Sequence, residues 1–304
     1  MNRVLITGIT GFLGSEIAKE LISKGIQVIG VKRQASDLKR IKAWGQTIEW
    51  IDADSDLFYD SLQSANPNFI IHSAWTGVGA NERDNLNIQF SNHDLLLKLL
   101  ASTETLAIRK IICFGSQAEY GQFSEVISED RPSRPTTAYG LAKQHQSEIL
   151  EHFCTTKNIN WIWLRLFSFF GETEDPNWFI PTLVRNILSK KPMDMTPGEQ
   201  SYAYMYVKDL AKVVVDVIEK DVFSGCYNVS SKKAISLKNI VKKIEGILGV
   251  KNSTVNFGAL PYRANQSMLI QGDVSKLEGQ IGEILESDFD KNLEAVIENI
   301  RSIK

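Results

Sequence analysis

The sequence predicts an α/β fold, in which a doubly wound parallel sheet carries a smaller C-terminal lobe. Three features predict it. Short continuous apolar segments alternate with amphipathic ones through residues 1–170, a pattern typical of parallel strands covered by helices on both faces. A glycine-rich turn separates the first apolar segment from the first amphipathic one. The following region is interrupted by prolines, which indicates loops and short helices: Pro176, Pro181, Pro192 and Pro197.

The first part of the chain is expected to supply the sheet and its covering helices. Five apolar segments are predicted to be buried strands: residues 3–7, 27–31, 47–51, 69–72 and 109–114. Apolar residues spaced three and four apart predict helices between them: residues 12–23, 55–63 and 82–101. A long helix at 136–157 and a strand at 161–167 are expected next. Right-handed crossovers between parallel strands then make the sheet doubly wound.

The second part of the chain is less regular. It contains a strand-like segment at 203–207 and helical patterns at 209–219 and 236–248. We expect two lobes that alternate along the sequence. Residues 1–170 and about 203–226 would form the sheet domain, and residues 171–202 and 227–304 the smaller lobe. That lobe would close over the carboxyl ends of the strands, where open α/β sheets bind ligands.

Composition excludes several classes of protein. The chain has 304 residues, with 34 basic and 36 acidic side chains and a net charge of -2, whereas nucleic-acid-binding domains are usually strongly basic. The most apolar stretch, residues 159–170, is too short for a membrane span. No metal site is expected from the four histidines, and the three cysteines suggest neither a disulfide nor zinc. We therefore expect a cytoplasmic protein that binds neither nucleic acid nor membrane.

The turn after the first predicted strand has the spacing of a dinucleotide-binding loop. Gly8, Gly11 and Gly14 form G-x-x-G-x-x-G, one residue wider than the G-x-G-x-x-G pattern. They allow a tight turn, a close approach of the backbone to a pyrophosphate, and close helix packing. The helix that follows offers free N–H groups to the phosphates. This arrangement predicts a Rossmann domain in which the cofactor contacts Gly8, Thr10, Gly11, Phe12, Leu13 and Gly14.

Residues after the next strands indicate which dinucleotide is bound. An NAD site normally has an acidic residue about 20 positions beyond the glycines, but this chain has Lys32 and Arg33. A guanidinium suits a 2′-phosphate, so we expect NADP, with NAD as the alternative. Further contacts are expected with the adenine from Asp52 and Ala53, and on the ribose side from Ser73 and Ala74.

A serine, a tyrosine and a lysine form the candidate catalytic group. Ser116 ends the fifth predicted strand, and Tyr139 and Lys143 lie four residues apart in the predicted long helix, on one face. A phenol has a pKa near ~10, and a neighbouring ammonium lowers it, so Lys143 is expected to bring the pKa of Tyr139 toward neutrality. Tyr139 would then act as the acid or base, and Ser116 would polarise a substrate carbonyl.

Together TGITGFLG, Ser116 and YGLAK resemble the extended short-chain dehydrogenase/reductase family, in particular its NAD(P)-dependent epimerase/dehydratase branch acting on nucleotide sugars. The likeness continues in Phe169-Phe170-Gly171, Tyr206-Val207-Lys208-Asp209, Tyr227-Asn228-Val229, Gly258 to Arg263 and Asp273-Val274-Ser275-Lys276. It implies hydride transfer at a sugar carbon by a Ser116–Tyr139–Lys143 triad, with Tyr139 and Lys143 also contacting the cofactor. It also implies a substrate held by the C-terminal lobe, and a homodimer through the two long helices flanking the active-site strand.

Departures from the family pattern narrow the reaction. Its 4,6-dehydratases carry Thr-Asp-Glu where this chain has Ser116-Gln117-Ala118, which lacks the acid and base that remove water. Epimerase/reductases similar to GDP-fucose synthase carry a cysteine at the position of Ala118. These departures leave 4-keto reduction and C4 epimerisation, and the basic Lys32-Arg33 pair favours the first, so we expect NADP-dependent reduction of a nucleotide-diphosphate 4-keto-6-deoxy sugar. An NAD-dependent C4 epimerase is the alternative; an NADP-sensing protein without catalysis and a flavonoid- or steroid-type reductase are minor ones.

Substrate contacts are expected from both lobes. Side chains after the fourth and fifth strands would face the sugar: Trp75, Thr76, Gln117 and Glu119. Asn177 and Phe179 match the family's nucleotide-sugar loop, and Arg263 could bind the diphosphate as a fork donor. Packing in the core is the other interpretation of Trp75 and Phe179, and a surface ion pair that of Arg263.

Overall fold

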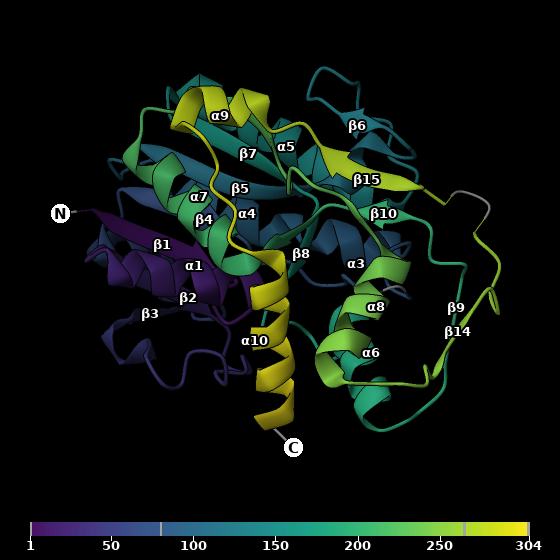
Figure 1. The fold of residues 1–304 in the computed structure, drawn as a ribbon. Helices are drawn as coiled ribbons and strands as arrows, with labels where there is room; N and C mark the ends of the chain where they lie inside the picture. The colour runs from purple at the N-terminus through teal and green to yellow at the C-terminus, as the bar shows by residue number, and fades with distance from the viewer. Residues whose placement is uncertain (1, 80, 264–265, 303–304) are drawn as a thin grey trace.

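The computed structural model describes residues 2–79, 81–263 and 266–302 and contains the expected parallel sheet (Figure 1). Seven strands lie in the order β12-β7-β5-β4-β1-β2-β3, and every neighbouring pair is parallel. Their bounds are β1 (Arg3–Thr7), β2 (Gln27–Lys32), β3 (Glu49–Asp52), β4 (Phe69–His72), β5 (Lys110–Ser116), β7 (Asn160–Leu166) and β12 (Gly225–Val229). The α/β fold class is confirmed.

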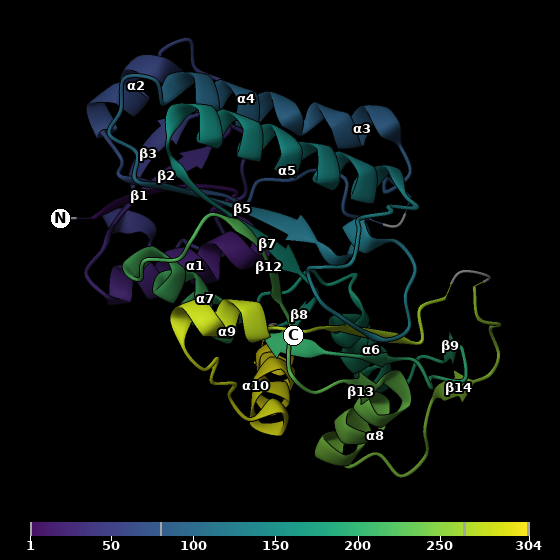
Figure 2. The ribbon, with the colours of Figure 1, turned by 90° about the horizontal axis from the view of Figure 1, so that it is seen from above.

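Helices cover both faces of the sheet (Figure 2). One face carries α2 (Phe58–Ala65), α4 (His93–Ser102) and α5 (Ala138–Lys157); the other carries α1 (Phe12–Ser23), α7 (Val207–Glu219) and α9 (Ser275–Ile281). Successive side chains of a strand point to opposite faces of the sheet. Val4 and Ile6 are therefore in the core beside α1, whereas Leu5 is in the core beside α2. This is why the strands are continuously apolar in sequence.

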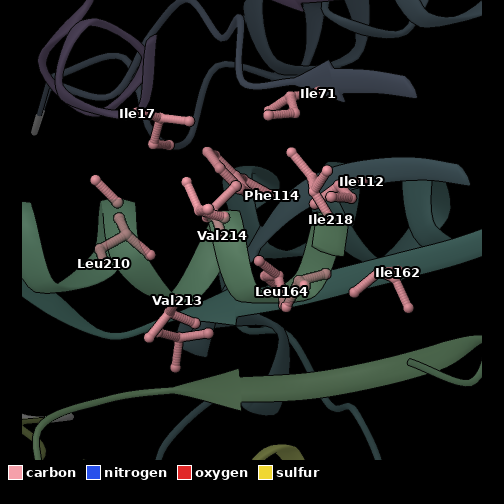
Figure 3. Close-up of a cluster of buried hydrophobic side chains, with 14 of the residues drawn as sticks. Ile17, Ile71, Ile112, Phe114, Ile162, Leu164, Leu210, Val213, Val214 and Ile218 are labelled. Carbon is pink, nitrogen blue, oxygen red and sulfur yellow. The ribbon is translucent and has the colours of Figure 1, made fainter. Parts of the chain in front are cut away.

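Figure 3 shows the core on the α7 side of the sheet, where Val214 and Ile218 of α7 lie among Ile112 and Phe114 of β5 and Leu164 of β7. All five side chains are at most 4% exposed. Burying each such side chain contributes roughly 1.5–3 kcal/mol. The central strands are therefore a rigid base for the residues at their carboxyl ends.

Two predicted elements differ in the structure. The single helix expected at 82–101 is two helices, α3 (Leu86–Ser91) and α4, which meet at Asn92. The Asn92 amide donates to the Thr76 and Ile88 carbonyl oxygens and accepts from the Thr76 N–H, which ties the break to the loop after β4. The segment expected to be a strand at 203–207 is only β11 (Tyr204–Tyr206), because α7 begins at Val207.

The smaller lobe has its own core, formed where α6 (Phe179–Leu188), α8 (Leu237–Leu248) and α10 (Phe289–Ser302) pack together. Its short strands are β6 (Val126–Ile127), β8 (Ser168–Phe170), β9 (Met193–Met195), β10 (Ser201–Tyr202), β11, β13 (Ile235–Ser236), β14 (Val255–Phe257) and β15 (Leu269–Gly272). Four of them form a separate sheet in the order β13-β10-β15-β6. Figures 1 and 2 show this lobe beside the carboxyl ends of the central strands.

The predicted lobe boundaries need three corrections. Strand β12 pairs with β7 as far as Val229, so residues 227–229 belong to the large sheet. Helix α9 returns to that sheet, because Leu277 and Ile281 are buried in the core beside α7. Conversely, β6 from the first part of the chain pairs with β15 of the smaller lobe. The lobes exchange short segments, which composition along the sequence does not reveal.

Candidate functional site

The site lies where the strand order of the large sheet reverses. From β1 the chain proceeds outward through β2 and β3, and then returns to β4 on the other side of β1. Loops leaving β1 and β4 therefore diverge at the carboxyl edge, the usual place for a ligand in such sheets. The glycine turn, Ser73, Ser116 and the start of α5 all follow strands at this edge.

Each glycine of the first turn has its own physical reason. Gly8 has φ +68°, and an added Cβ would stand 2.6 Å from the Ala74 backbone N. A Cβ on Gly14 would stand 2.3 Å from the Gly8 carbonyl oxygen. A Cβ on Gly11 would have only that same oxygen within 4 Å, at 3.1 Å. Gly8 and Gly14 thus allow close packing inside the protein. Gly11, by contrast, has few protein atoms beside the position of a Cβ, which leaves room there for a ligand.

The start of α1 fits the pyrophosphate of a dinucleotide. Gly11 is the N-cap of this helix and provides no side chain to accept from the first-turn N–H groups. Unpaired N–H groups and the positive end of the helix dipole favour an anion at this position. Thr10, Phe12 and Leu13 belong to the same turn. These residues could hold the phosphates as the sequence predicts.

Ser73 and Ala74 are held against the end of β1. The Ser73 hydroxyl donates to the Thr7 carbonyl oxygen at 2.7 Å, and the Ala74 N–H donates to Thr7 Oγ1 at 3.3 Å. Thr7 Oγ1 also contacts His72 Nδ1 at 2.9 Å. Burial lowers the pKa of His72 to about 3, so this imidazole is neutral. The contacts hold the start of the loop after β4 against the end of β1, and the expected place of Ser73 and Ala74 on the ribose side stays a prediction.

The basic pair lies at the end of β2. Lys32 pairs in register with Asp52 of β3, and the Ala53 N–H donates to the Lys32 carbonyl oxygen at 2.8 Å. Arg33 is exposed, and its backbone N–H donates to Ser36 Oγ at 3.0 Å in a turn. The Asp52 carboxylate accepts from the Asp54 N–H at 3.0 Å. Among the residues that the structure describes, the Arg33 guanidinium has no hydrogen-bond partner, and its contact with a 2′-phosphate stays a prediction.

Arg40 is a cofactor-side residue that the sequence analysis missed. Its guanidinium donates to the Thr173 carbonyl oxygen at 2.9 Å and to the Thr10 carbonyl oxygen at 3.5 Å. Gly171 lies close to the Phe12 ring, since an added Cβ would stand 3.2 Å from it. The segment from Gly171 to Thr173 is thus fastened beside the glycine turn. No spacing in the sequence links these distant positions.

The three candidate catalytic residues lie near one another in the structure, and their catalytic roles stay predictions. Ser116 is the last residue of β5, and Tyr139 is the second residue of α5, whose N-cap Thr137 accepts from the Gly140 N–H at 3.1 Å. The Ser116 side chain lies beside the Tyr139 phenol and stabilises its ionised form. Lys143 is buried at 5% exposure, and its Nζ donates to the Phe114 carbonyl oxygen at 2.6 Å.

Burial dominates the ionisation of this group. It raises the pKa of Tyr139 above its ordinary value, while the Arg83 charge and the Ser116 hydroxyl oppose that shift. Burial likewise lowers the pKa of Lys143 to about 7, against the opposing effect of the Glu119 carboxylate. In the structure the Arg83 charge is therefore the cation that favours the Tyr139 phenolate. The role expected of Lys143 stays a prediction.

Trp75 lies at the centre of the site. Its ring makes an edge contact with Tyr139 at a centroid distance of 5.7 Å, and Lys143 Nζ lies 3.5 Å from its centroid. The indole N–H donates to Gln89 Oε1 at 2.9 Å. Trp75 is thus a wall of the site. Thr76, next to it, is exposed, and Asn92 holds its backbone.

Glu119 does not face a substrate. Its side chain is fully buried, and its carboxylate accepts from the Ser116 N–H at 2.7 Å, the Trp163 indole at 3.1 Å and Arg165 Nε at 2.8 Å. The carboxylate is turned away because a buried charge needs such partners. Gln117, in the same 3₁₀ turn, is half-buried, and its contact with a substrate stays a prediction.

The substrate residues predicted on the smaller lobe are spread over two segments. Asn177 is exposed, and its N–H donates to Asp175 Oδ1 at 2.8 Å in the loop before α6. Phe179, the first residue of α6, packs against the core of the lobe. Arg263 is exposed on the segment after β14, near enough to Tyr202 to lower the pKa of that phenol, although burial raises it overall. Their substrate roles stay predictions.

Among residues 2–79, 81–263 and 266–302, no helix is both long enough and apolar enough to cross a membrane. In the same residues, no three His, Cys, Asp or Glu side chains are grouped so as to hold a metal ion.

Two relatives among curated proteins match nearly the whole chain. The dTDP-6-deoxy-L-talose 4-dehydrogenase (NAD(+)) of Aggregatibacter actinomycetemcomitans is 27% identical over 286 residues, covering 88% of this chain and 98% of the relative. The CDP-abequose synthase of Salmonella typhimurium is 25% identical over 307 residues, covering 98% of each chain.

Solved structures share the fold at lower identity. The UDP-N-acetylglucosamine 4-epimerase from Methanobrevibacter ruminantium M1, in complex with UDP-N-acetylmuramic acid, has a TM-score of 0.88 at 23% identity and covers 100% of this chain and 99% of its own. The UDP-glucuronic acid 4-epimerase from Bacillus cereus, in complex with UDP-glucuronic acid and NAD, has a TM-score of 0.86 at 22% identity, covering 99% and 100%.

A family model gives the most specific assignment. The model of the NAD dependent epimerase/dehydratase family matches residues 4–230, which include the glycine turn, Ser116, Tyr139 and Lys143. The match covers well over half of the chain. The protein therefore belongs to this family of NAD(P)-dependent enzymes, within the extended short-chain dehydrogenases/reductases.

Proposed function

We propose that the protein is an NADP-dependent reductase of a nucleotide-diphosphate 4-keto-6-deoxy sugar. The observation that carries the proposal is the pairing of Ser116 with Tyr139 at a strand end that lacks a dehydratase's acid and base, since Gln117 and Ala118 follow the serine. The basic residues Lys32 and Arg33 at the end of β2 favour the phosphorylated cofactor. A reductase needs a cofactor that exchanges at each turnover, and reduced NADP is the usual donor.

The residues perform the proton half of the reaction. NADPH, when bound, supplies the hydride to the sugar carbonyl carbon. Ser116 donates a hydrogen bond to the carbonyl oxygen, which stabilises the negative charge that develops there. Tyr139 gives its phenolic proton to that oxygen, and the electron pair of the broken O–H bond stays on the phenolate. Trp75 covers one side of Tyr139 and helps to exclude water from the site.

The names of three relatives support the substrate class. Besides the dTDP-6-deoxy-L-talose 4-dehydrogenase and the CDP-abequose synthase, the dTDP-4-dehydro-6-deoxyglucose reductase of Escherichia coli is 22% identical over 317 residues. Two of the three names describe redox chemistry on a 6-deoxy sugar carried by a nucleotide. In this chain Asn177, Phe179 and Arg263 would hold the nucleotide diphosphate.

A homodimer is also proposed, through the exposed faces of α4 and α5. A shallow, mainly apolar groove runs between these helices and includes Leu97, which is 48% exposed, with Leu100, Ile149 and Phe153. A second copy of the chain would cover it. Light scattering after chromatography should give twice the chain mass, and Leu97→Glu should reduce it to the mass of one chain. A monomeric unsubstituted protein would reject the dimer.

The function is tested by mixing the protein with NADPH and a panel of 4-keto-6-deoxy nucleotide sugars while the absorbance of reduced cofactor is followed. Oxidation of NADPH with one member of the panel is expected. No oxidation with any member, together with NAD retained in the purified protein, would replace the reductase by a C4 epimerase.

Tyr139→Phe separates an enzyme from a sensor of NADP. The phenylalanine has no proton to transfer, so turnover should fall about 10²–10⁴-fold. Binding of NADPH, measured by fluorescence, should remain. Full turnover in this variant would contradict the role of Tyr139.

A further inference from the structure

Arg83 lies on the catalytic tyrosine. The central carbon of its guanidinium lies 4.4 Å from the centroid of the Tyr139 ring. This geometry is that of a cation over the face of a phenol. Within the described part of the chain the Arg83 side chain makes no hydrogen bond or ion pair, so its charge is not neutralised by a carboxylate.

The position of Arg83 is fixed by the backbone. The Tyr139 N–H donates to the Arg83 carbonyl oxygen at 2.8 Å, and the next N-terminal residue of α5, Ala138, donates its N–H to Asp84 Oδ1 at 3.2 Å. The Arg83 N–H itself donates to the Gly79 carbonyl oxygen at 3.2 Å. The segment that carries Arg83 is thus attached to the turn of α5 that carries Tyr139.

The other charged groups around Tyr139 are Lys143 on the same helix and Glu119 in the turn after β5. Lys143 Nζ is occupied by the Phe114 carbonyl oxygen and the face of Trp75, and burial lowers its pKa to about 7. The Glu119 carboxylate is paired with Arg165 at 2.8 Å. A guanidinium keeps its proton at every pH at which proteins stay folded. Arg83 is therefore the permanent cation facing this phenol.

We propose that Arg83 is a positioning residue that stabilises the phenolate of Tyr139 after it has given its proton to the substrate oxygen. The inference deepens the proposed function and rests on Tyr139 being the proton donor. In the step itself the Tyr139 O–H bond breaks, the proton forms an O–H bond on the sugar, and the electron pair left on Tyr139 faces the Arg83 cation. Bulk water then restores the phenol.

The test measures the ionisation of Tyr139 directly, without substrate. Tyrosines are replaced by ring-fluorinated tyrosine, which lowers phenol pKa values into a range where the protein is folded, and fluorine NMR spectra are recorded against pH. The Tyr139 resonance is assigned as the one missing in Tyr139→Phe. Arg83→Gln should raise the pKa of Tyr139 by about one unit, since an opposite charge at this distance shifts a pKa by one to three units.

Two further variants give the comparison its controls. Arg83→Lys keeps the charge and should leave most of the shift intact, and Arg83→Met is a second neutral variant should Arg83→Gln not fold. Arg109→Gln removes another arginine over a ring, 5.2 Å from the Phe69 centroid at the amino end of the sheet, and should leave the Tyr139 pKa unchanged.

An unchanged pKa of Tyr139 in the neutral Arg83 variants would overturn the proposal. An equal rise in Arg109→Gln would also overturn it, because the effect would then not depend on proximity. Failure of the proposed function has a different signature. It would appear as no oxidation of NADPH with any 4-keto-6-deoxy nucleotide sugar, whatever the Arg83 variants do to the NMR titration.

Discussion

The turn after β1 and the turn after β5 both end a strand at the same edge of the sheet, but they are held in different ways. The first depends on glycines and on backbone contacts within residues 8–14, together with the hydroxyl of Thr7. The second depends on buried charges, because Glu119 holds the Ser116 N–H and is itself held by Trp163 and Arg165, 44 and 46 residues away. The glycines that shape the first turn are close together in the sequence, whereas the buried charges that hold the second turn come from distant segments.

The largest effect is expected from a substitution that disrupts the turn after β1. In Gly14→Ala the new methyl group would stand 2.3 Å from the Gly8 carbonyl oxygen, so the turn must move. We expect a loss of NADPH binding and destabilisation of the protein by several kcal/mol, as for other strained core substitutions. Gly246→Ala in α8 is the control, since nothing lies within 4 Å of its added Cβ. It should stabilise the protein by up to ~1 kcal/mol in urea unfolding; equal losses would contradict the comparison.

The next largest effect is expected from a substitution that disrupts the turn after β5. Glu119→Gln leaves the Arg165 guanidinium buried without its counter-charge, which costs about 3–5 kcal/mol. Glu125→Gln removes an exposed pair with Arg131 and should change stability by at most about 1 kcal/mol. Urea unfolding of both variants measures the difference. Similar small losses would mean that the buried pair does not hold this turn.

Arg33→Ser addresses the choice of cofactor and should have a smaller effect. A charged hydrogen bond contributes about 1.5–3 kcal/mol, so the KM for NADPH should rise roughly 10–100-fold while that for NADH hardly changes. Lys39→Ser is a nearby control, because Lys39 is exposed and paired with Asp37. A parallel rise in both KM values would show that Arg33 does not contact a 2′-phosphate.

The smallest effect compares helix caps in the two lobes. Thr137 accepts from the Gly140 N–H at the start of α5, and Ser236 accepts from the Asn239 N–H at the start of α8. Replacing either by alanine should cost about 1 kcal/mol of stability. Only Thr137→Ala should also lower turnover, because α5 carries Tyr139 in its first turn. Equal turnover in the two variants would contradict this prediction, because the Thr137 cap would then not affect the position of Tyr139.

The difference between the two turns explains what the sequence could predict. The strands, the first helix and the glycine turn follow from local patterns, and Ser116, Tyr139 and Lys143 follow from strand and helix periodicity. The break at Asn92 depends on a contact with Thr76, and the burial of Glu119 depends on Arg165. Neither contact is visible in the residues nearby in the sequence, which therefore predicts a continuous helix and a Glu119 that faces the sugar.

Arg83 and Arg40 are the clearest residues beyond the reach of the sequence. Arg83 lies at the start of the segment predicted as a helix at 82–101, but it precedes α3 and meets Tyr139 only because this part of the chain docks on α5. Arg40 likewise meets Thr173 across 133 positions. The lobe boundaries differed for the same reason, since β6 and α9 each pack with the lobe that is distant in sequence.

The most direct test of the proposed reaction follows the hydrogen itself. The protein is given NADPH deuterated on the transferring face of its nicotinamide and the 4-keto-6-deoxy nucleotide sugar that it accepts, and the product is analysed by mass spectrometry and NMR. We expect one deuterium on the reduced sugar carbon and an equal amount of NADP formed. A product without deuterium, formed with no net consumption of NADPH, would contradict the reductase and favour the epimerase.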